Sequence, residues 1–213
     1  MALTSLLVES YAAQNARWPQ TGRHVLAQFD DDAVVVYQAY RPAIGHFAAE
    51  HGYFGGEFSL DRMSWIKPNF LWMMYRCGWA TKEGQEVVLA ISLARTAFDE
   101  ILAQAVPSSF VDRFYKDRDA WQAAVASSDV RLQWDPDHGP HGNPVERRAV
   151  QLGLRGKVLA SYARDWIRRI EDITPFVHEQ CAVLKRDGKE ALITPLERVY
   201  PVTGTNQLGV DSV

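Results

Sequence analysis

The stretch Arg62-Met63-Ser64-Trp65-Ile66-Lys67-Pro68-Asn69-Phe70-Leu71-Trp72-Met73-Met74-Tyr75-Arg76-Cys77-Gly78-Trp79 is the most apolar part of the 213-residue chain. Pro68 suits the first turn of a helix, because its ring presets φ and its missing N–H would find no helical acceptor there. Gly78 is a typical helix end. The residues between them are apolar nearly all round, so we predict a buried helix over 68–77. A short strand over 63–66 is expected to precede it.

Three cations lie inside this apolar stretch, at Arg62, Lys67 and Arg76. The predicted strand would deliver Lys67 to the mouth of the helix. An unpaired buried charge is costly. We therefore expect Lys67 to reach solvent, a carboxylate or an anionic ligand.

Composition is typical of a globular protein, with 47% hydrophobic and 23% charged residues. The net charge of −3 argues against a protein that coats nucleic acid non-specifically, although a local basic patch stays open. Cys77 and Cys181 are far apart in the sequence, so we expect reduced thiols rather than a disulfide. We see no secretion signal, membrane span or lipidation motif, and we therefore expect a cytoplasmic protein.

Periodicity predicts an alternation of strands and helices. Strands are expected over 24–29, 33–40, 63–66, 86–93, 130–134 and 192–200, and helices over 43–51, 68–77, 96–106, 145–157 and 158–186. This order indicates an α+β fold with a mixed or mostly antiparallel sheet flanked by helices. We expect an N-terminal arm over 1–22, a single globular domain over 23–202 and a flexible tail over 203–213.

The loop over 135–144 is rich in Pro and Gly and also carries Asp135, Asp137, His138 and His141. Two carboxylates and two imidazoles could ligate a metal. Their spacing matches no strong metal-binding template, and a rigid turn explains most of the composition. We therefore expect no metal, with these four residues as weak candidates for a metal-dependent hydrolase.

On a helix over 145–157, Arg148, Gln151 and Arg155 would share one face, with Arg147 adjacent. Such a set of donors suits phosphate or carboxylate. A surface helix paired with the preceding acidic loop is the alternative. The sequence has no Gly-x-Gly-x-x-Gly, Walker loop, Gly-x-Ser-x-Gly, His-Glu-x-x-His or Cys-x-x-Cys motif, which argues against the enzyme classes that these motifs define.

Three segments carry a family resemblance: residues 62–76, Trp134-Asp135-Pro136-Asp137-His138 and residues 147–156. With them the chain, from about His24 to Tyr200, resembles the bacterial and fungal domain-of-unknown-function family numbered 4291. The resemblance implies a stand-alone single domain. It does not imply an activity.

The predicted order of elements also resembles ADP-ribosyltransferase-like folds. That resemblance implies that Ser64 matches the serine or tyrosine position on the second strand, and that Glu197 matches the terminal catalytic glutamate. In such enzymes this carboxylate holds the ribose 2′-hydroxyl while nicotinamide leaves. The first strand departs from the pattern, since Tyr37 and Gln38 stand where His or Arg usually grips the dinucleotide, and Arg41 follows.

The leading hypothesis is an ADP-ribosyltransferase-like enzyme that uses NAD on a nucleic-acid or small-molecule acceptor. Ser64 and Glu197 would be catalytic. The binding residues would be Tyr37, Gln38, Arg41, Arg62, Trp65, Lys67, Trp134, Arg147, Arg148, Gln151 and Arg155. The alternatives are a non-catalytic module that binds RNA or a nucleotide, and an enzyme like RNA 2′-phosphotransferases.

Overall fold

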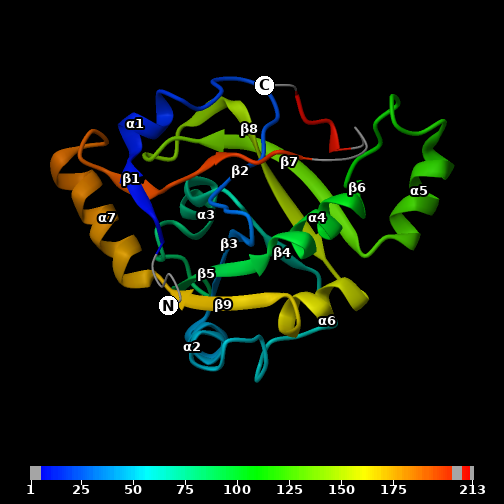
Figure 1. The fold of residues 1–213 in the computed structure, drawn as a ribbon, viewed down its shortest axis with the longest axis horizontal. Helices are drawn as coiled ribbons and strands as arrows, with labels where there is room; N and C mark the ends of the chain where they lie inside the picture. Colours follow the sequence, from blue (N-terminus) through cyan, green and yellow to red (C-terminus); the bar gives the residue numbers. More distant parts are fainter. Residues whose placement is uncertain (1–5, 203–207, 212–213) are drawn as a thin grey trace.

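The computed structural model describes residues 6–202 and 208–211. Its helices are α1 (Tyr11–Asn15), α2 (Pro42–His51), α3 (Phe70–Cys77), α4 (Arg95–Ala103), α5 (Arg118–Ser127), α6 (Gly156–Arg164) and α7 (Thr174–Asp187). Its strands are β1 (Val8–Ser10), β2 (Leu26–Ala27), β3 (Ala33–Tyr40), β4 (Ser64–Ile66), β5 (Val87–Ala94), β6 (Ala105–Pro107), β7 (Val130–His138), β8 (Pro144–Leu154), β9 (Ile167–Asp172), β10 (Ile193–Pro195) and β11 (Arg198–Val199). The predicted α+β class is confirmed, and the chain folds as one domain (Figure 1).

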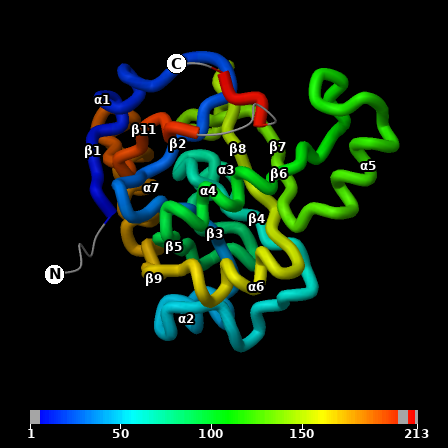
Figure 2. The backbone as a smooth tube through the Cα atoms, turned by 45° about the vertical axis from the view of Figure 1, so that its right-hand side comes forward, coloured from blue at the N-terminus to red at the C-terminus, as the bar shows by residue number. Residues whose placement is uncertain are grey.

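Two larger sheets organise the fold. The first has the order β3-β5-β9 and is antiparallel, and the second has the order β4-β8-β7-β6. Only the β6–β7 pair of the second sheet is parallel, so the prediction of a mixed, mostly antiparallel sheet is confirmed. Figures 1 and 2 show α7 and α5 at opposite ends of the molecule, with α2 below the first sheet.

The two sheets meet at Tyr37 of β3 and Lys67, which directly follows β4. The Tyr37 N–H donates to the Lys67 carbonyl over 2.7 Å, and the Lys67 N–H donates back over 3.2 Å. This bridge fixes the backbone of Lys67 at the junction between the sheets.

Strand β5 is buried on both faces, as its nearly continuous apolar sequence predicts. Leu89 and Ile91 face a core that includes residues of α2 and α4, whereas Val88 and Ala90 face a second core that includes α3 and α7. Helix α3 belongs to this second core, and most of its side chains are buried. It begins two residues later than predicted, because the side chain of Asn69 caps it by accepting a 2.7 Å hydrogen bond from the N–H of Trp72.

Two segments that were predicted to be helical are strands. Residues 145–157 fall mostly in β8, and residues 167–172, inside the predicted helix 158–186, form β9. In β8 the side chains of Val150, Leu152 and Leu154 are at most 1% exposed, and their spacing of two residues is the period of a strand. Strand β8 pairs with both β7 and β4, and this long-range pairing outweighs the helical spacing of its polar residues.

The loop predicted over 135–144 is shorter than expected. Strand β7 continues to His138, and β8 resumes at Pro144. Gly142 lies in the turn between them with φ of 80°, a conformation that favours glycine.

Both ends of the described chain pack against the domain. Strand β1 pairs with β10, and Tyr11 and Trp18 are buried. Residues 1–5 of the expected arm, and 203–207 and 212–213 of the expected tail, lie outside the described residues. Within the tail, Leu208 is buried, and its carbonyl accepts a 2.8 Å hydrogen bond from Nε1 of Trp134.

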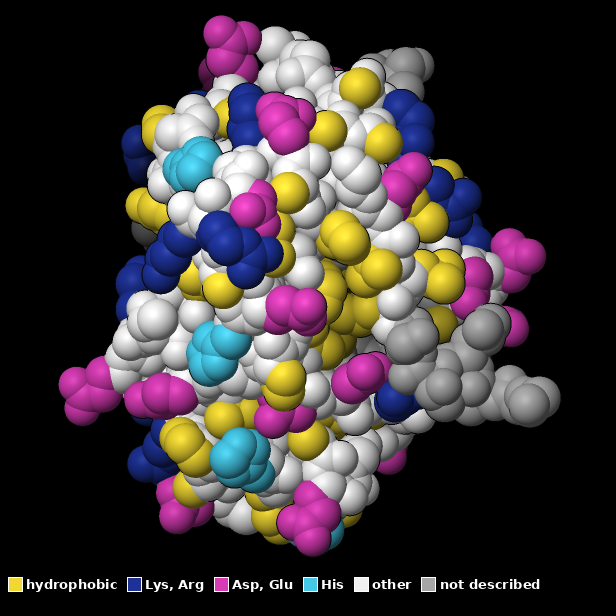
Figure 3. Space-filling view, turned by 90° about the vertical axis from the view of Figure 1, so that its left-hand side faces the viewer, with side chains coloured by type: hydrophobic (Ala, Val, Ile, Leu, Met, Phe, Trp, Pro, Cys, Tyr) yellow, Lys and Arg dark blue, Asp and Glu magenta, His cyan; other side chains and the backbone are white. Residues whose placement is uncertain are grey.

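The surface over α7, α1 and β1 carries hydrophobic side chains around a hollow (Figure 3). Leu7 and Val8, at β1, and Ile193, on β10, are exposed. None of the helices in the described part of the chain has the length and apolarity needed to cross a membrane. Cys77 and Cys181 are both free thiols, so no disulfide joins them.

Candidate functional site

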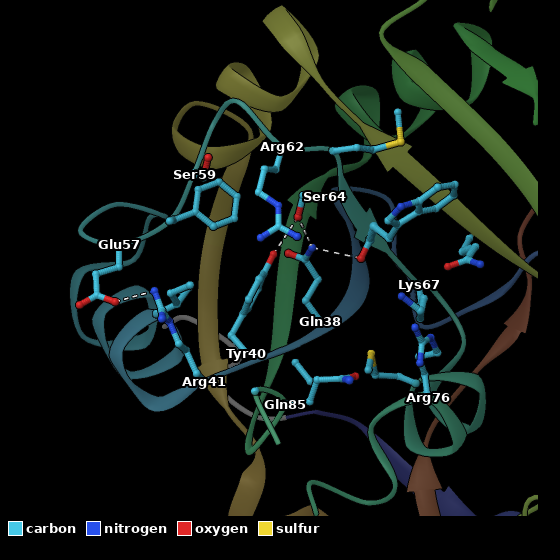
Figure 4. Close-up of a pocket in the computed structure, with 18 of the residues that line it drawn as sticks. Gln38, Tyr40, Arg41, Glu57, Ser59, Arg62, Ser64, Lys67, Arg76 and Gln85 are labelled. Atoms are coloured by element: carbon cyan, nitrogen blue, oxygen red, sulfur yellow. Dashed lines mark hydrogen bonds and ion pairs between the residues drawn. The ribbon is translucent and has the colours of Figure 1, made fainter. Parts of the chain in front are cut away.

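A cavity of about 780 Å³ opens beside the junction of the two sheets (Figure 4). Strand β3 contributes Gln38 and Tyr40, and β4 contributes Ser64 and Trp65. Residues 57–59 and 62–63 of the long connection before β4 line another part of it. Its size suits a ligand as large as a nucleotide.

Neutral polar groups form the centre of the cavity wall. Nε2 of Gln38 donates to the hydroxyl of Ser64 over 2.8 Å, and that hydroxyl shares a 2.7 Å hydrogen bond with Tyr40. Oε1 of Gln38 accepts from the Tyr162 hydroxyl over 2.7 Å. Burial raises the pKa of Tyr40, so this network is uncharged at neutral pH. Among the described residues no His, Asp or Glu hydrogen-bonds to Ser64, and its hydroxyl therefore lacks a base that would activate it as a nucleophile.

The charged side chains of the cavity are mostly cations. Arg41, Arg62, Lys67 and Arg76 line it, whereas Glu57 is its one acidic lining residue among the described residues. Glu57 pairs with Arg41 over 2.6 Å. Within the described residues, neither hydrogen bonds nor ion pairs engage the charged groups of Arg62, Lys67 and Arg76.

Lys67 is the most buried of these cations, with 5% of its surface exposed. Burial, followed by the charge of the neighbouring Arg76, lowers the pKa of the Lys67 amine to about 8. Figure 4 shows the Lys67 amine pointing into the cavity beside Arg76, and Arg62 above the Gln38–Ser64–Tyr40 network.

A second group of polar residues lies where β7 and β8 reach the cavity. Asp135 accepts a 2.7 Å hydrogen bond from Nε2 of Gln133 and another of 2.7 Å from Nε2 of Gln151. Both glutamines line the cavity. Asp135 thus fixes their amide groups in the wall, where each can bond to a ligand.

Trp65 provides an aromatic wall. It lies opposite Gly153 in the β4–β8 pair. A Cβ at position 153 would come within 3.0 Å of the Trp65 ring and 2.6 Å of Sδ of Met63. Glycine at this position therefore lets the indole lie against β8, where its face can stack on a planar ligand group.

Glu197 does not line the cavity. Glu197 is 2% exposed. Its side-chain oxygens accept hydrogen bonds from the N–H of Phe70, over 2.6 Å, and from Nδ2 of Asn69, over 3.0 Å. Burial raises the pKa of Glu197 well above its ordinary value, and the N–H of Phe70 opposes this shift. The residue thus binds the first turn of α3 and does not meet Ser64 in one site.

Arg147 and Tyr37 are also buried away from the cavity. Nε of Arg147 donates to Oδ2 of Asp137 over 2.7 Å, and its guanidinium lies 5.2 Å from the centre of the Trp18 ring. Tyr37 is fully buried and packs edge-on against Phe70, 5.6 Å between ring centres. Trp134 does not line the cavity, and its Nε1 donates to the Leu208 carbonyl. Arg148 is exposed and also lies outside the cavity lining.

Arg155 binds the C-terminal end of α5. Its NH2 donates to the carbonyls of Val125, Ala126 and Ser128 at 3.1, 3.0 and 3.0 Å. A cation stabilises the negative end of a helix dipole. Helix α5 has no buried residue, so its ends contribute much of its stability.

We therefore expect Arg155→Ala to weaken α5 locally by about 1–2 kcal/mol. Amides of residues 118–127 should exchange hydrogen about tenfold faster, whereas those of β5 should not change. Arg168→Ala, at an exposed arginine of β9, is the control. If the amides of α5 exchange at the same rate in Arg155→Ala and Arg168→Ala, Arg155 does not stabilise the end of α5.

The four weak metal candidates are separated by their contacts. Asp135 binds Gln133 and Gln151, and Asp137 binds Arg147. His138 stacks on Tyr75 with ring centres 3.5 Å apart, and His141 is exposed. The described part of the chain holds no group of three or more His, Cys, Asp or Glu that could bind a metal ion.

The structure thus brings seven of the predicted site residues to one cavity: Gln38, Arg41, Arg62, Ser64, Trp65, Lys67 and Gln151. Tyr40, Glu57, Arg76, Gln85 and Gln133 also line the cavity but are not among the predicted site residues. Arg76 did carry a signal, because it is a charge inside an apolar helix. Tyr40, Glu57, Gln85 and Gln133 carry no comparable signal in the sequence.

Together, these features define an α+β domain with a cationic cavity between its two sheets. A model of the family described as "Domain of unknown function (DUF4291)" matches residues 24–200, and the chain belongs to this family. A search of the curated proteins finds no match to the chain.

Proposed function

We propose that the protein binds a phosphate-bearing ligand of nucleotide size in the cavity between the sheets. The observation that carries this proposal is that Arg62, Lys67 and Arg76 line one cavity and have no carboxylate partner within the described residues. A cavity lined mostly by one sign of charge attracts ions of the opposite sign. We expect this cavity to attract anions although the whole chain has a net charge of −3.

The neutral groups suit the rest of such a ligand. Trp65 offers a face for a planar ring, and Gln133 and Gln151 offer amide groups for hydroxyl or amino groups. Two free cysteines are consistent with a reducing compartment, and we propose a cytoplasmic location on this ground.

Transfer of ADP-ribose from NAD, with a nucleic acid or a small molecule as acceptor, stays a prediction. Ser64 lies in the cavity, whereas Glu197 lies outside its lining. The binding proposal does not require Ser64 or Glu197 to react. The separation of these two residues therefore favours binding over transfer. Release of nicotinamide from NAD that is lost in a folded Glu197→Ala variant would instead favour transfer.

The binding proposal predicts that AMP, ADP or NAD binds the full chain more tightly than uncharged adenosine does, as measured by isothermal titration calorimetry. Charged hydrogen bonds contribute about 1.5–3 kcal/mol each. Arg62→Ala or Arg76→Ala should therefore weaken binding of the nucleotide by about ten- to a hundredfold.

The control is Arg168→Ala, which removes the same charge from an exposed site outside the cavity. Its affinity for the nucleotide should match that of the unmodified protein. If adenosine binds as tightly as AMP, or if Arg168→Ala loses as much affinity as Arg62→Ala, the cavity is not the phosphate site.

A further inference from the structure

Lys67 presents an amine at a fixed position in the cavity. Its backbone is bonded on both sides to Tyr37, at 2.7 and 3.2 Å. Pro68 and the capping residue Asn69 follow directly. The side chain is 5% exposed and lines the cavity, so the amine has little freedom to move away.

The surroundings of Lys67 disfavour its charged form. Within the described residues it forms no ion pair, and Arg76 adds a like charge close by. Asp135 acts in the opposite direction but less strongly. Desolvation and a neighbouring cation are the two means by which proteins make a lysine amine neutral and nucleophilic near neutral pH.

We propose that Lys67 forms an imine with the carbonyl carbon of a phosphate-bearing aldehyde or ketone held in this cavity. The lone pair of the neutral amine forms the new C–N bond, while the π electrons of the carbonyl move to its oxygen. This oxygen then leaves as water with the two amine hydrogens, and a C=N bond remains. No oxidant or reductant is needed.

The arrangement of cations fits a ligand with two distinct ends. Figure 4 shows Arg62 above the Gln38–Ser64–Tyr40 network and Lys67 farther along the cavity. A phosphate beside Lys67 would favour the ammonium form, whereas a phosphate on Arg62 leaves the amine free to react. The inference rests on the proposed function, because it uses the same cavity for the phosphate.

The test uses pyridoxal 5′-phosphate as a phosphate-bearing aldehyde on the full chain, followed by borohydride. Borohydride delivers a hydride to the imine carbon and so makes the link permanent. Peptide mass spectrometry should find Lys67 modified at least about tenfold more than the exposed Lys82 and Lys157 of the same molecules. Pyridoxal, which lacks the phosphate, should modify Lys67 much less.

Two variants make the result specific. Arg62→Ala should lower modification of Lys67 while leaving Lys82 unaffected. Lys67→Arg cannot form the imine and should remove the selective product, provided that its Tm shows a folded protein. Lys67→Met serves in its place if the arginine does not fit.

Modification of Lys67 no greater than that of Lys82 would overturn the inference. AMP binding by calorimetry separates this failure from that of the proposed function. If AMP binds and Lys67 is not selectively trapped, only the imine is excluded. If AMP does not bind and no selective trapping occurs, both proposals fail.

Discussion

Replacement of Glu197 by alanine is expected to lower the free energy of unfolding by about 3 kcal/mol, because two buried hydrogen-bond donors would be left without an acceptor. The N–H of Phe70 and Nδ2 of Asn69 would lose their acceptor. Truncation also leaves a void beside the first turn of α3, and such voids add to the cost.

The backbone of Glu197 forms two further hydrogen bonds, which the substitution by alanine would not remove. Its N–H donates to Oε1 of Gln14 over 2.8 Å, and its carbonyl accepts from Nε1 of Trp18 over 2.9 Å. Position 197 therefore joins the N-terminal segment, α3 and the last strands of the chain.

The loss of stability should depend on pH. The pKa of Glu197 in the folded protein lies above its ordinary value because of burial, so the folded state holds this proton more tightly than the unfolded state. The stabilisation is complete below the unfolded pKa and is lost as pH rises through the folded pKa. The difference between unmodified protein and Glu197→Ala should thus be larger at about pH 5 than at about pH 8.

Urea unfolding at both pH values measures this difference. Glu179→Ala, at an exposed glutamate of α7, is the control and should change stability little at either pH. A difference that grows with rising pH would show that the Glu197 carboxyl is ionised in the folded protein. The donors from Asn69 and Phe70 would then outweigh burial.

The strands that the sequence predicted well are those whose own residues determine their structure. Residues 33–40 and 86–93 are mostly β-branched or apolar and contain no Gly or Pro. Both form strands that differ from the prediction by at most one residue at either end. The helix predicted over 145–157 was wrong, because the buried residues Val150, Leu152 and Leu154 are spaced by two, which is the period of a strand. The helical spacing of Arg148, Gln151 and Arg155 does not decide the structure here.

Site residues could be predicted from the sequence only where a charged residue stands among apolar neighbours. Arg62, Lys67 and Arg76 interrupt an apolar stretch, and all three line the cavity. Arg147 and Arg155 also look suited to phosphate in the sequence. Their partners, Asp137 and the carbonyl groups at the end of α5, lie near them only once β7 and β8 have paired. The role of each cation therefore depends on contacts between segments that are distant in the sequence. The local sequence pattern does not predict these contacts.

The second large effect is expected at Asp137, whose removal should cost about 3–5 kcal/mol of stability, because it leaves Arg147 buried without its carboxylate. Asp137 is 1% exposed. Its Oδ2 accepts a 2.7 Å hydrogen bond from Nε of Arg147 and forms an ion pair with NH2 of the same side chain, also at 2.7 Å. Among the described residues, Arg147 would then keep a 2.8 Å hydrogen bond to the Pro19 carbonyl and its contact with the Trp18 ring.

A double-mutant cycle measures the interaction energy of the Asp137–Arg147 pair apart from the effect of removing each side chain alone. Asp137→Ala combined with Arg147→Leu should be more stable than the sum of the two single losses predicts, because no unpaired charge remains. Glu9→Ala is the matched control, since it breaks the exposed pair with Arg17 and should change stability little. Equal small losses in Asp137→Ala and Glu9→Ala would show that the Arg147–Asp137 pair does not hold the fold.

Asp137 should also influence the proton on Glu197. The negative charge of Asp137 raises the pKa of Glu197, and the positive charge of Arg147 lowers it, although burial is the largest cause of the shift. In Asp137→Ala the one cation is left to face the remaining carboxylate, so the pKa of Glu197 should fall. Stability of this variant should then decline less between about pH 5 and pH 8 than that of the unmodified protein. An unchanged decline would mean that the two carboxyl groups titrate independently, in spite of sharing Arg147.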